Sequence, residues 1–182
     1  MHERGPVQIN IPRDFFYGEN MHTIRAPKKL THSAGSEEVL QDAVKLIKNA
    51  KNPVILAGGG VSMGGAYDEV AALAEYLGVP VACTYLHNDS FPANHPNSVG
   101  NLGYQGHKSA MNAMHEADVV IALGSRLSVF GTLPQYNFDY FPKNAKIIQV
   151  DIDQRRLGLS KKVDCLVHGD CKQAAASMLT RL

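Results

Sequence analysis

The sequence predicts an α/β protein with a Rossmann-like, doubly wound parallel sheet of five to six strands and helices on both faces. Short runs rich in β-branched residues alternate along the chain with amphipathic runs of helical period. Glycines and acidic residues directly follow most of these short runs. The alternation favours repeated strand, helix, strand units, and polar residues at strand ends are typical of the carboxyl edge of such a sheet.

The first predicted element of the sheet domain is a helix over residues 37–48. Ser36 is its expected N-cap, acidic residues fill the first turn, and apolar residues recur on one face. Strands and helices then alternate. The predicted strands are Val54–Ala57, Pro80–Thr84, Val119–Leu123, Ile147–Val150 and Val163–Val167. The further predicted helices are Tyr67–Leu77, Lys108–Ala117 and Cys171–Leu182.

The beginning of the chain does not resemble the beginning of a domain. Residues 5–12, "GPVQINIP", alternate apolar and polar side chains like a strand. A polar, proline-containing segment follows, in which no partner strand is predicted. We therefore expect residues 1–35 to stand apart from a single domain over residues 36–182.

Composition and charge exclude several classes of partner. Lysine and arginine number 18 against 17 aspartates and glutamates, which leaves no basic face of the kind that binds nucleic acid or an anionic membrane. Three cysteines, an odd number without Cys-x-x-Cys spacing, indicate reduced thiols. Because no apolar run approaches the roughly 20 residues of a membrane span and the start lacks the apolar core of a signal peptide, we expect a soluble, cytoplasmic protein.

The residues that follow the predicted strands form the candidate site. The carboxyl ends of parallel strands share one edge, where glycines let a backbone approach a pyrophosphate and a following helix offers N–H groups. The alternative is that the glycines only make a tight turn and close packing between strand and helix. Met63 breaks the dinucleotide fingerprint, so an ordinary NAD dehydrogenase is not indicated.

Two other segments offer weaker signals, and no catalytic constellation is predicted within this chain. His87 and His95 lie in a loop rich in proline and asparagine without metal-ligand spacing, so we expect solvated loop side chains and no metal site. The segment 129–142, "VFGTLPQYNFDYFP", is long, apolar and not periodic. Its aromatic side chains predict packing against another domain or subunit.

Seven segments in order carry a resemblance to a known family. They are "GPVQINIPRDFF", "NPVILAGGGV", "LGVPVACTYLHNDSFPANHP", "GNLGYQGHKSAM", "ADVVIALGSRLSVFGTLPQY", "KIIQVDIDQRRLG" and "HGDCKQA". Together they resemble the central domain of thiamine-diphosphate-dependent enzymes of the acetolactate synthase type. Within that group, "LGYQGHKSAM" and "FGTLPQYNFDYFP" are most similar to the sulfoacetaldehyde acetyltransferase branch.

The resemblance implies an organisation and an activity. Residues 1–35 would be the end of a preceding pyrimidine-binding domain with its linker, and the chain would be part of a longer enzyme. That enzyme would convert sulfoacetaldehyde and phosphate to acetyl phosphate and sulfite, as a homodimer or homotetramer. Thiamine diphosphate and Mg²⁺ would be bound by the pyrimidine-binding and diphosphate-binding domains, so this chain alone is expected to be inactive.

The resemblance also implies which residues of this chain could hold a cofactor. In some relatives the central domain binds FAD or an ADP-containing nucleotide, which leaves a nucleotide, coenzyme A or FAD possible here. The sequence "LSVF" after Arg126 departs from the acidic pattern of FAD-binding relatives. The alternatives are an acetolactate synthase-like, FAD-binding central domain or a stand-alone nucleotide-binding domain. The matching positions are Gly58, Gly59, Gly60, Val61, Gly103, Gly106, Gly124, Ser125, Arg126, Asp151, Ile152, Asp153, Gly169 and Asp170.

Overall fold

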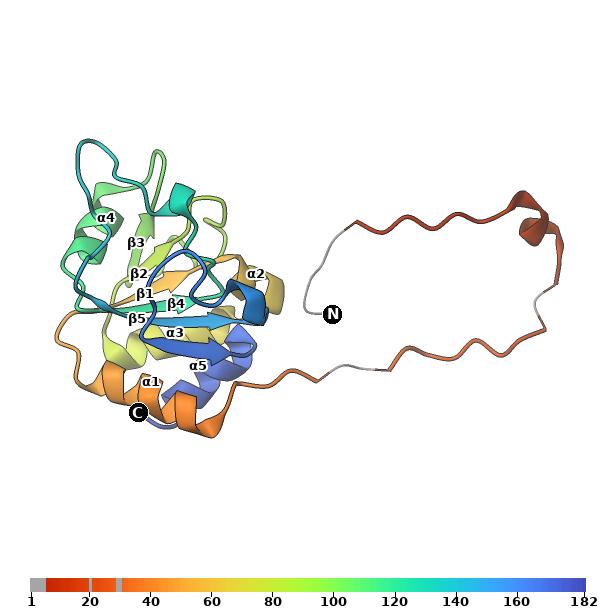
Figure 1. The fold of residues 1–182 in the computed structure, drawn as a ribbon, viewed down its shortest axis with the longest axis horizontal. Helices are drawn as coiled ribbons and strands as arrows, with labels where there is room; N and C mark the ends of the chain where they lie inside the picture. Colours follow the sequence, from red (N-terminus) through yellow and green to blue (C-terminus); the bar gives the residue numbers. More distant parts are fainter. Residues whose placement is uncertain (1–5, 20, 29–30) are drawn as a thin grey trace. The chain divides into compact units, whose positions relative to one another are not determined.

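The computed structural model describes residues 6–19, 21–28 and 31–182, which divide into two units, Met1–Thr31 and His32–Leu182 (Figure 1). In the described part of the first unit, the only regular element is a 3-10 helix, η1 (Arg13–Tyr17). Residues 6–12 form no strand among the described residues, in keeping with a segment for which no partner strand is predicted within this chain. That they form the last strand of a preceding domain stays a prediction. The first residue of the predicted strand, at position 5, lies outside the described residues.

The second unit contains a sheet of six parallel strands in the order β3-β2-β1-β4-β5-β6, which confirms the predicted fold class. Five strands match the predicted ones to within about two residues. The sixth, β3, escaped prediction because its sequence, "SVGN", contains a single β-branched residue and forms a half-buried edge. The strands are β1 (Pro53–Ala57), β2 (Val81–Cys83), β3 (Ser98–Asn101), β4 (Val119–Leu123), β5 (Lys146–Asp151) and β6 (Cys165–His168).

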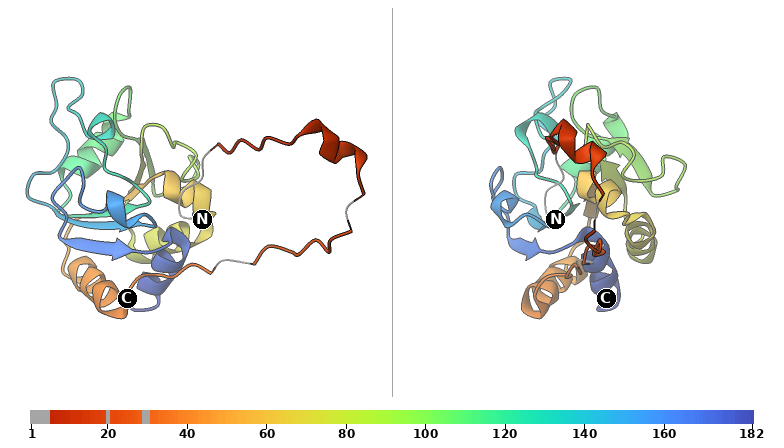
Figure 2. Two further views of the ribbon diagram at one scale, coloured as in Figure 1. Left: turned by 45° about the vertical axis from the view of Figure 1, so that its right-hand side comes forward. Right: turned by 90° about the vertical axis from the view of Figure 1, so that its right-hand side faces the viewer.

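Helices cover both faces of this sheet, with α1, α3 and α5 on one face and α4 on the other (Figures 1 and 2). The α1 helix begins as predicted, because the Ser36 hydroxyl oxygen accepts from the Val39 N–H at 3.4 Å. A short helix, α2, was not predicted because half of its residues are glycine, which has a low helix propensity. The elements are α1 (Glu37–Lys48), α2 (Gly59–Gly64), α3 (Tyr67–Leu77), α4 (Lys108–His115), α5 (Cys171–Leu179), η2 (Val129–Gly131) and η3 (Gln154–Arg156).

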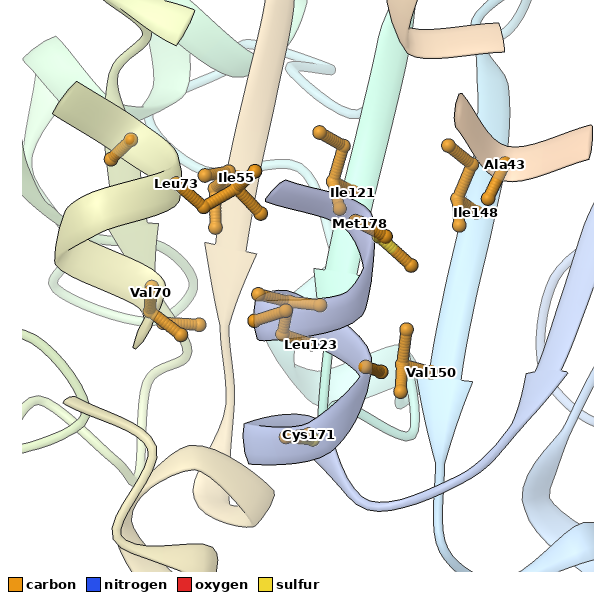
Figure 3. Close-up of a cluster of buried hydrophobic side chains, with 14 of the residues drawn as sticks. Ala43, Ile55, Val70, Leu73, Ile121, Leu123, Ile148, Val150, Cys171 and Met178 are labelled. Carbon is orange, nitrogen blue, oxygen red and sulfur yellow. The ribbon is translucent and has the colours of Figure 1, made fainter. Parts of the chain in front are cut away.

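The core is built by alternation along the strands. In β1, Ile55 and Ala57 belong to the cluster beneath α1, α3 and α5, whereas Val54 and Leu56 belong to the cluster beneath α4. Figure 3 shows Ile55 of β1 beside Leu73 of α3 and Ile121 of β4 beside Met178 of α5. It also shows Ile148 of β5 beside Ala43 of α1. Both sheet faces are therefore buried, as a parallel sheet requires.

Other expectations can be compared directly with the described residues. The three cysteines are free and buried, in agreement with reduced thiols. No helix in the described part of the chain combines the length and apolar character that crossing a membrane demands.

Candidate nucleotide-binding edge of the sheet

Most of the predicted site residues lie at the carboxyl edge of the four neighbouring strands β1, β4, β5 and β6. Gly58 follows β1, Gly124 follows β4, Asp151 ends β5 and Gly169 follows β6. Backbone hydrogen bonds join these strand ends, since the Gly58 N–H donates to the Leu123 carbonyl oxygen at 2.9 Å and the Gly169 N–H donates to that of Asp151 at 3.0 Å. The sheet thus brings these segments together as expected.

The glycines after β1 and β4 pack directly against each other. A Cβ atom on Gly58 would lie 2.5 Å from the carbonyl oxygen of Gly124, and one on Gly60 would lie 2.6 Å from the Gly124 Cα atom. Gly124 itself has φ +62°. Close approach of two backbones therefore accounts for all three glycines without a ligand.

The amide groups of the glycine turn already have partners within the protein. Besides the Gly58 amide, the Gly60 N–H donates to the Gly124 carbonyl oxygen at 3.0 Å, and the Val61 N–H donates to that of Gly58 at 2.9 Å. The Val61 side chain is fully buried in the core. In this arrangement, none of these three amides is free to bind a phosphate.

The loop after β2 covers the same turn, which sequence reasoning missed. A Cβ atom on Gly59 would lie 2.5 Å from Nε2 of His87, so the imidazole rests on the glycine backbone. The Ser90 hydroxyl is fully buried and donates to the Gly58 carbonyl oxygen at 2.9 Å. The only sequence signal was a serine and a histidine in a proline-rich loop, which does not identify their partners.

The expectation of solvated histidines in this loop is wrong. His87 is half-buried against Gly59. The side chain of His95 is 14% exposed, its ring centroid lies 4.8 Å from that of Phe91, and its Nε2 lies 3.2 Å from a Glu75 carboxylate oxygen. Both rings pack as structural side chains. Among the described residues, no group of three or more His, Cys, Asp or Glu side chains is arranged to hold a metal.

The polar half of the edge lies at the end of β5. Asp151 is buried and its Oδ1 accepts from the Asp153 N–H at 2.9 Å. Burial raises the pKa of the Asp151 carboxyl, and the negative charge of Asp153 raises it further. The hydrogen bond from the Asp153 N–H and the positive charges of Arg156 and Arg126 act to lower this pKa, but the net shift is upward. This end of the sheet therefore combines a carboxylate with an exposed arginine, Arg126.

The residues that follow Asp151 form hydrogen bonds with other residues of the protein. Asp153 accepts from Arg155 Nη2 at 2.9 Å and from Arg156 Nε at 3.2 Å. The Ile152 carbonyl oxygen lies 3.1 Å from Nε2 of His168. These contacts fix the loop after β5 at the polar half of the edge.

Three other predicted residues serve the local structure. Ser125 is buried, and its Oγ accepts from the Leu127 N–H at 3.2 Å. A Cβ atom on Gly169 would lie 2.5 Å from the Ala34 carbonyl oxygen, so this glycine packs on the segment before α1. Asp170 caps α5, accepting from the N–H groups of its first turn at 3.0 and 3.2 Å.

Gly103 and Gly106 contact a different set of residues. They lie between β3 and α4. A Cβ atom on Gly103, which has φ +89°, would lie 3.0 Å from the Tyr85 Cβ atom, and one on Gly106 would lie 2.5 Å from the Asn101 carbonyl oxygen. Their nearest neighbours therefore do not include the glycines after β1 and β4.

An exposed aromatic cluster, formed by Tyr85, Tyr104 and Phe130, lies beside Gly103. The Tyr85 ring centroid is 5.3 Å from that of Phe130 and 6.2 Å from that of Tyr104. Tyr104 and Phe130 are 51% and 54% exposed. By contrast, Tyr140 and Phe141 are buried in the core beneath α4, so the far end of segment 129–142 packs within this domain and not on another.

Comparison with known proteins identifies the family. The family model described as "Thiamine pyrophosphate enzyme, central domain" matches residues 40–179. The chain belongs to this family. The central-domain match agrees with the resemblance inferred from the seven segments.

Two curated relatives match nearly the whole chain, including residues outside the central-domain match. Sulfoacetaldehyde acetyltransferase of Alcaligenes xylosoxydans xylosoxydans is 57% identical over 182 residues, which are 100% of this chain and 30% of that protein. The acetolactate synthase large subunit of Corynebacterium glutamicum is 36% identical over 179 residues, 96% of this chain and 28% of that protein. The chain thus spans about 30% of the length of the first of these curated relatives.

A solved structure supports the fold. Benzoylformate decarboxylase from Polynucleobacter necessarius superposes with a TM-score of 0.69 at 20% identity, over 89% of this chain and 30% of that chain. At this identity the likeness bears on the architecture alone.

Proposed function

We propose that this chain is the central, non-catalytic domain of a thiamine-diphosphate-dependent acetyltransferase that converts sulfoacetaldehyde and phosphate to acetyl phosphate and sulfite. The observation that carries the proposal is the 57% identity over the whole chain to a sulfoacetaldehyde acetyltransferase, compared with 36% to an acetolactate synthase large subunit. The substrate choice rests on this difference.

In this proposal the domain positions its neighbours and does not perform the chemistry. Thiamine diphosphate stabilises the carbanion in such reactions, and the protein supplies binding and orientation. The cofactor and Mg²⁺ would be held by the pyrimidine-binding and diphosphate-binding domains of the same polypeptide. The described residues of this chain offer no cluster of metal ligands that would take over that role.

The surface for those neighbours would be the aromatic cluster. Exposed apolar patches rimmed by polar residues are typical of interfaces, and Leu86 and Val129, next to the cluster residues in sequence, are 74% and 61% exposed. Docking here would help to fix the cleft between the catalytic domains in a homodimer or homotetramer. The buried free thiols fit a reducing cytoplasm.

An assay of the complete gene product that contains this chain tests the proposal. With sulfoacetaldehyde, phosphate, thiamine diphosphate and Mg²⁺ we expect release of sulfite and formation of acetyl phosphate. Pyruvate in place of sulfoacetaldehyde is the matched control and should give no acetolactate. Acetolactate from pyruvate together with no sulfite from sulfoacetaldehyde would overturn the assignment in favour of an acetolactate synthase.

A second function, binding of an ADP-containing nucleotide, coenzyme A or FAD at the carboxyl edge, is favoured by one observation. Asp151 ends β5 and the exposed Arg126 follows β4, so a carboxyl group and a cation lie at the same edge, where the charge of Arg126 acts to lower the Asp151 pKa. A carboxylate can accept from a ribose hydroxyl, and an arginine can bind a phosphate.

Thermal unfolding with each of the three compounds tests this second function. A compound that binds the native state alone raises the melting temperature. Arg126→Gln should remove the rise without changing the unliganded melting temperature, because Arg126 is exposed. Gly59→Val is unsuitable as the variant, since its side chain would collide with His87. If none of the compounds raises the melting temperature at millimolar concentration, the edge serves packing alone.

A further inference from the structure

A concavity of about 630 Å³ lies at the opposite edge of the sheet from the glycines. Its lining includes Lys146, the first residue of β5, and Asp164, which directly precedes β6. The other lining residues come from the long segment between β4 and β5, from Ile147 and from residues 161 and 162. Volumes of about 300–1,000 Å³ are typical of sites for small organic molecules.

The walls of this cavity carry more positive than negative charge. Four lysines line it, at positions 143, 146, 161 and 162, against two aspartates, Asp139 and Asp164. Two of the lysines are neutralised by these aspartates, because Lys146 Nζ lies 2.8 Å from Asp164 Oδ1 and Lys143 Nζ lies 3.0 Å from Asp139 Oδ2. Two positive charges, those of Lys161 and Lys162, remain.

The Asp164 carboxylate accepts hydrogen bonds from two residues. Its Oδ2 accepts from the Ile147 N–H at 3.0 Å while its Oδ1 accepts from Lys146. Burial acts to raise the pKa of this carboxyl, but the bonds from Lys146 and Ile147 and the charge of Lys162 outweigh it and leave the pKa below its ordinary value. Asp164 is therefore ionised at neutral pH and keeps Lys146 in place.

Neither remaining lysine forms a hydrogen bond or a close ion pair with any residue that the structure describes. The ammonium of Lys161, which is half-buried, lies 4.8 Å from the ring centroid of Phe141, a cation–π contact that orients it. Lys162 is exposed. The two ammonium groups are thus available to a ligand that carries about two negative charges.

The rest of the lining is apolar. Leu133, Pro134, Phe141 and Pro142 face the same cavity. An inorganic anion would fill only the charged end and leave the exposed Leu133 and Pro134 in contact with water. A ligand with an apolar or aromatic body and a dianionic group matches both halves.

We propose that this cavity binds a small organic phosphomonoester, with the phosphate at Lys161 and Lys162 and an aromatic or apolar body against the exposed side chains of Leu133 and Pro134. The proposal is independent of nucleotide binding at the carboxyl edge, because none of the residues predicted for that edge lines this cavity. The site lies at the amino ends of β5 and β6, where a bound molecule would contact the long segment between β4 and β5.

Phenyl phosphate is the probe, and isothermal titration of the 182-residue chain is the measurement. We expect saturable binding at millimolar concentration that weakens as salt is raised, because the attraction is electrostatic. Lys161→Gln with Lys162→Gln should weaken the affinity by about tenfold or more. Lys162→Gln alone, which leaves the contact with Phe141 intact, should weaken it by a smaller factor. Phenol, which has no phosphate, should bind far more weakly.

The control is Lys45→Gln with Lys51→Gln, which changes the net charge equally on an exposed surface around α1. It should leave the affinity unchanged. Equal weakening by the two double variants would show a non-specific charge effect and overturn the proposal. The proposal would also be overturned if phenol bound as tightly as phenyl phosphate, or if phenyl phosphate did not bind at all. Thermal unfolding of each variant confirms that the fold is intact.

Discussion

Substitution of Gly124 by alanine should destabilise the protein because there is no room for the added methyl group. Gly124 has φ +62°, and its Cβ atom would collide with the Gly60 Cα atom and lie 2.9 Å from the Cys171 Sγ atom. Gly65 is the matched control, since it has φ +61° and nothing lies within 4 Å of its Cβ position. The two substitutions therefore carry the same backbone strain and differ in the collision.

The expected magnitudes follow from these two terms. Alanine in the left-handed region costs about 1–2 kcal/mol. Alanine also restricts the unfolded chain, which stabilises the folded protein by about 0.4–1 kcal/mol. The net cost of Gly65→Ala is therefore about 1 kcal/mol. Overpacking adds about 1–3 kcal/mol at Gly124, so Gly124→Ala should cost about 3 kcal/mol. That loss corresponds to a fall in Tm of about 6–12 °C for a domain of this size.

Urea unfolding of both variants and the unsubstituted chain measures the difference. We expect the free energy of unfolding to fall by about 2 kcal/mol more for Gly124→Ala than for Gly65→Ala, with unchanged m-values. Equal losses in the two variants would refute the view that backbone contact between the loops after β1 and β4 is what requires a glycine at position 124.

Three further substitutions or treatments test other parts of the structure. Ser90→Ala should lower the free energy of unfolding by about 1 kcal/mol in urea, because it removes one of the two donors to the buried Gly58 carbonyl oxygen and leaves only the Val61 N–H; an unchanged midpoint would contradict this. Asp118→Asn should cost about 1 kcal/mol at neutral pH, since the carboxylate accepts two backbone N–H groups at 2.7 and 2.9 Å. Burial acts to raise the Asp118 pKa, but these bonds outweigh it and lower the pKa. The stabilisation is therefore present above the unfolded carboxyl pKa and lost as pH falls through the folded one, and a loss independent of pH would argue against it. Burial raises the pKa of Cys83 and Cys165 to about 11, so a thiol reagent at pH 8 should label them slowly in the native protein and rapidly in urea; equal rates would show that the thiols are accessible.

Helices and strands whose apolar residues recur with a regular period could be predicted from sequence, because that period follows from which side chains are buried. The strand Val119–Leu123 and the helix Tyr67–Leu77 have the predicted bounds. Strand β3 and helix α2 could not be predicted, since their glycine-rich sequences have weak intrinsic preferences and tertiary contacts decide their conformation. The two predicted helices that ended late, at Ala117 and Leu182, are in fact shorter by two and three residues.

The location of the candidate site could be predicted from sequence, but the contacts that its residues make could not. The rule that parallel strands share a carboxyl edge placed Gly58, Gly124 and Asp151 together correctly. Whether a glycine faces a ligand or another backbone depends on contacts between residues more than 60 positions apart, which the pattern of one sequence does not contain. The same limit applies to His87 in the loop after β2, whose partner, Gly59, is the first residue of α2.

The strand order divides the carboxyl edge into two halves with different capacities for a ligand. The chain reverses its direction of winding between β1 and β4, where loops in such sheets diverge and leave a crevice. Here Gly60 and Gly124 close that crevice with a hydrogen bond of 3.0 Å. A ligand entering between them would have to break this bond before gaining any contact. Binding at Arg126 and Asp151 requires no such opening, so a nucleotide that binds this edge should lose affinity in Arg126→Gln, whereas Gly124→Ala should mainly lose stability.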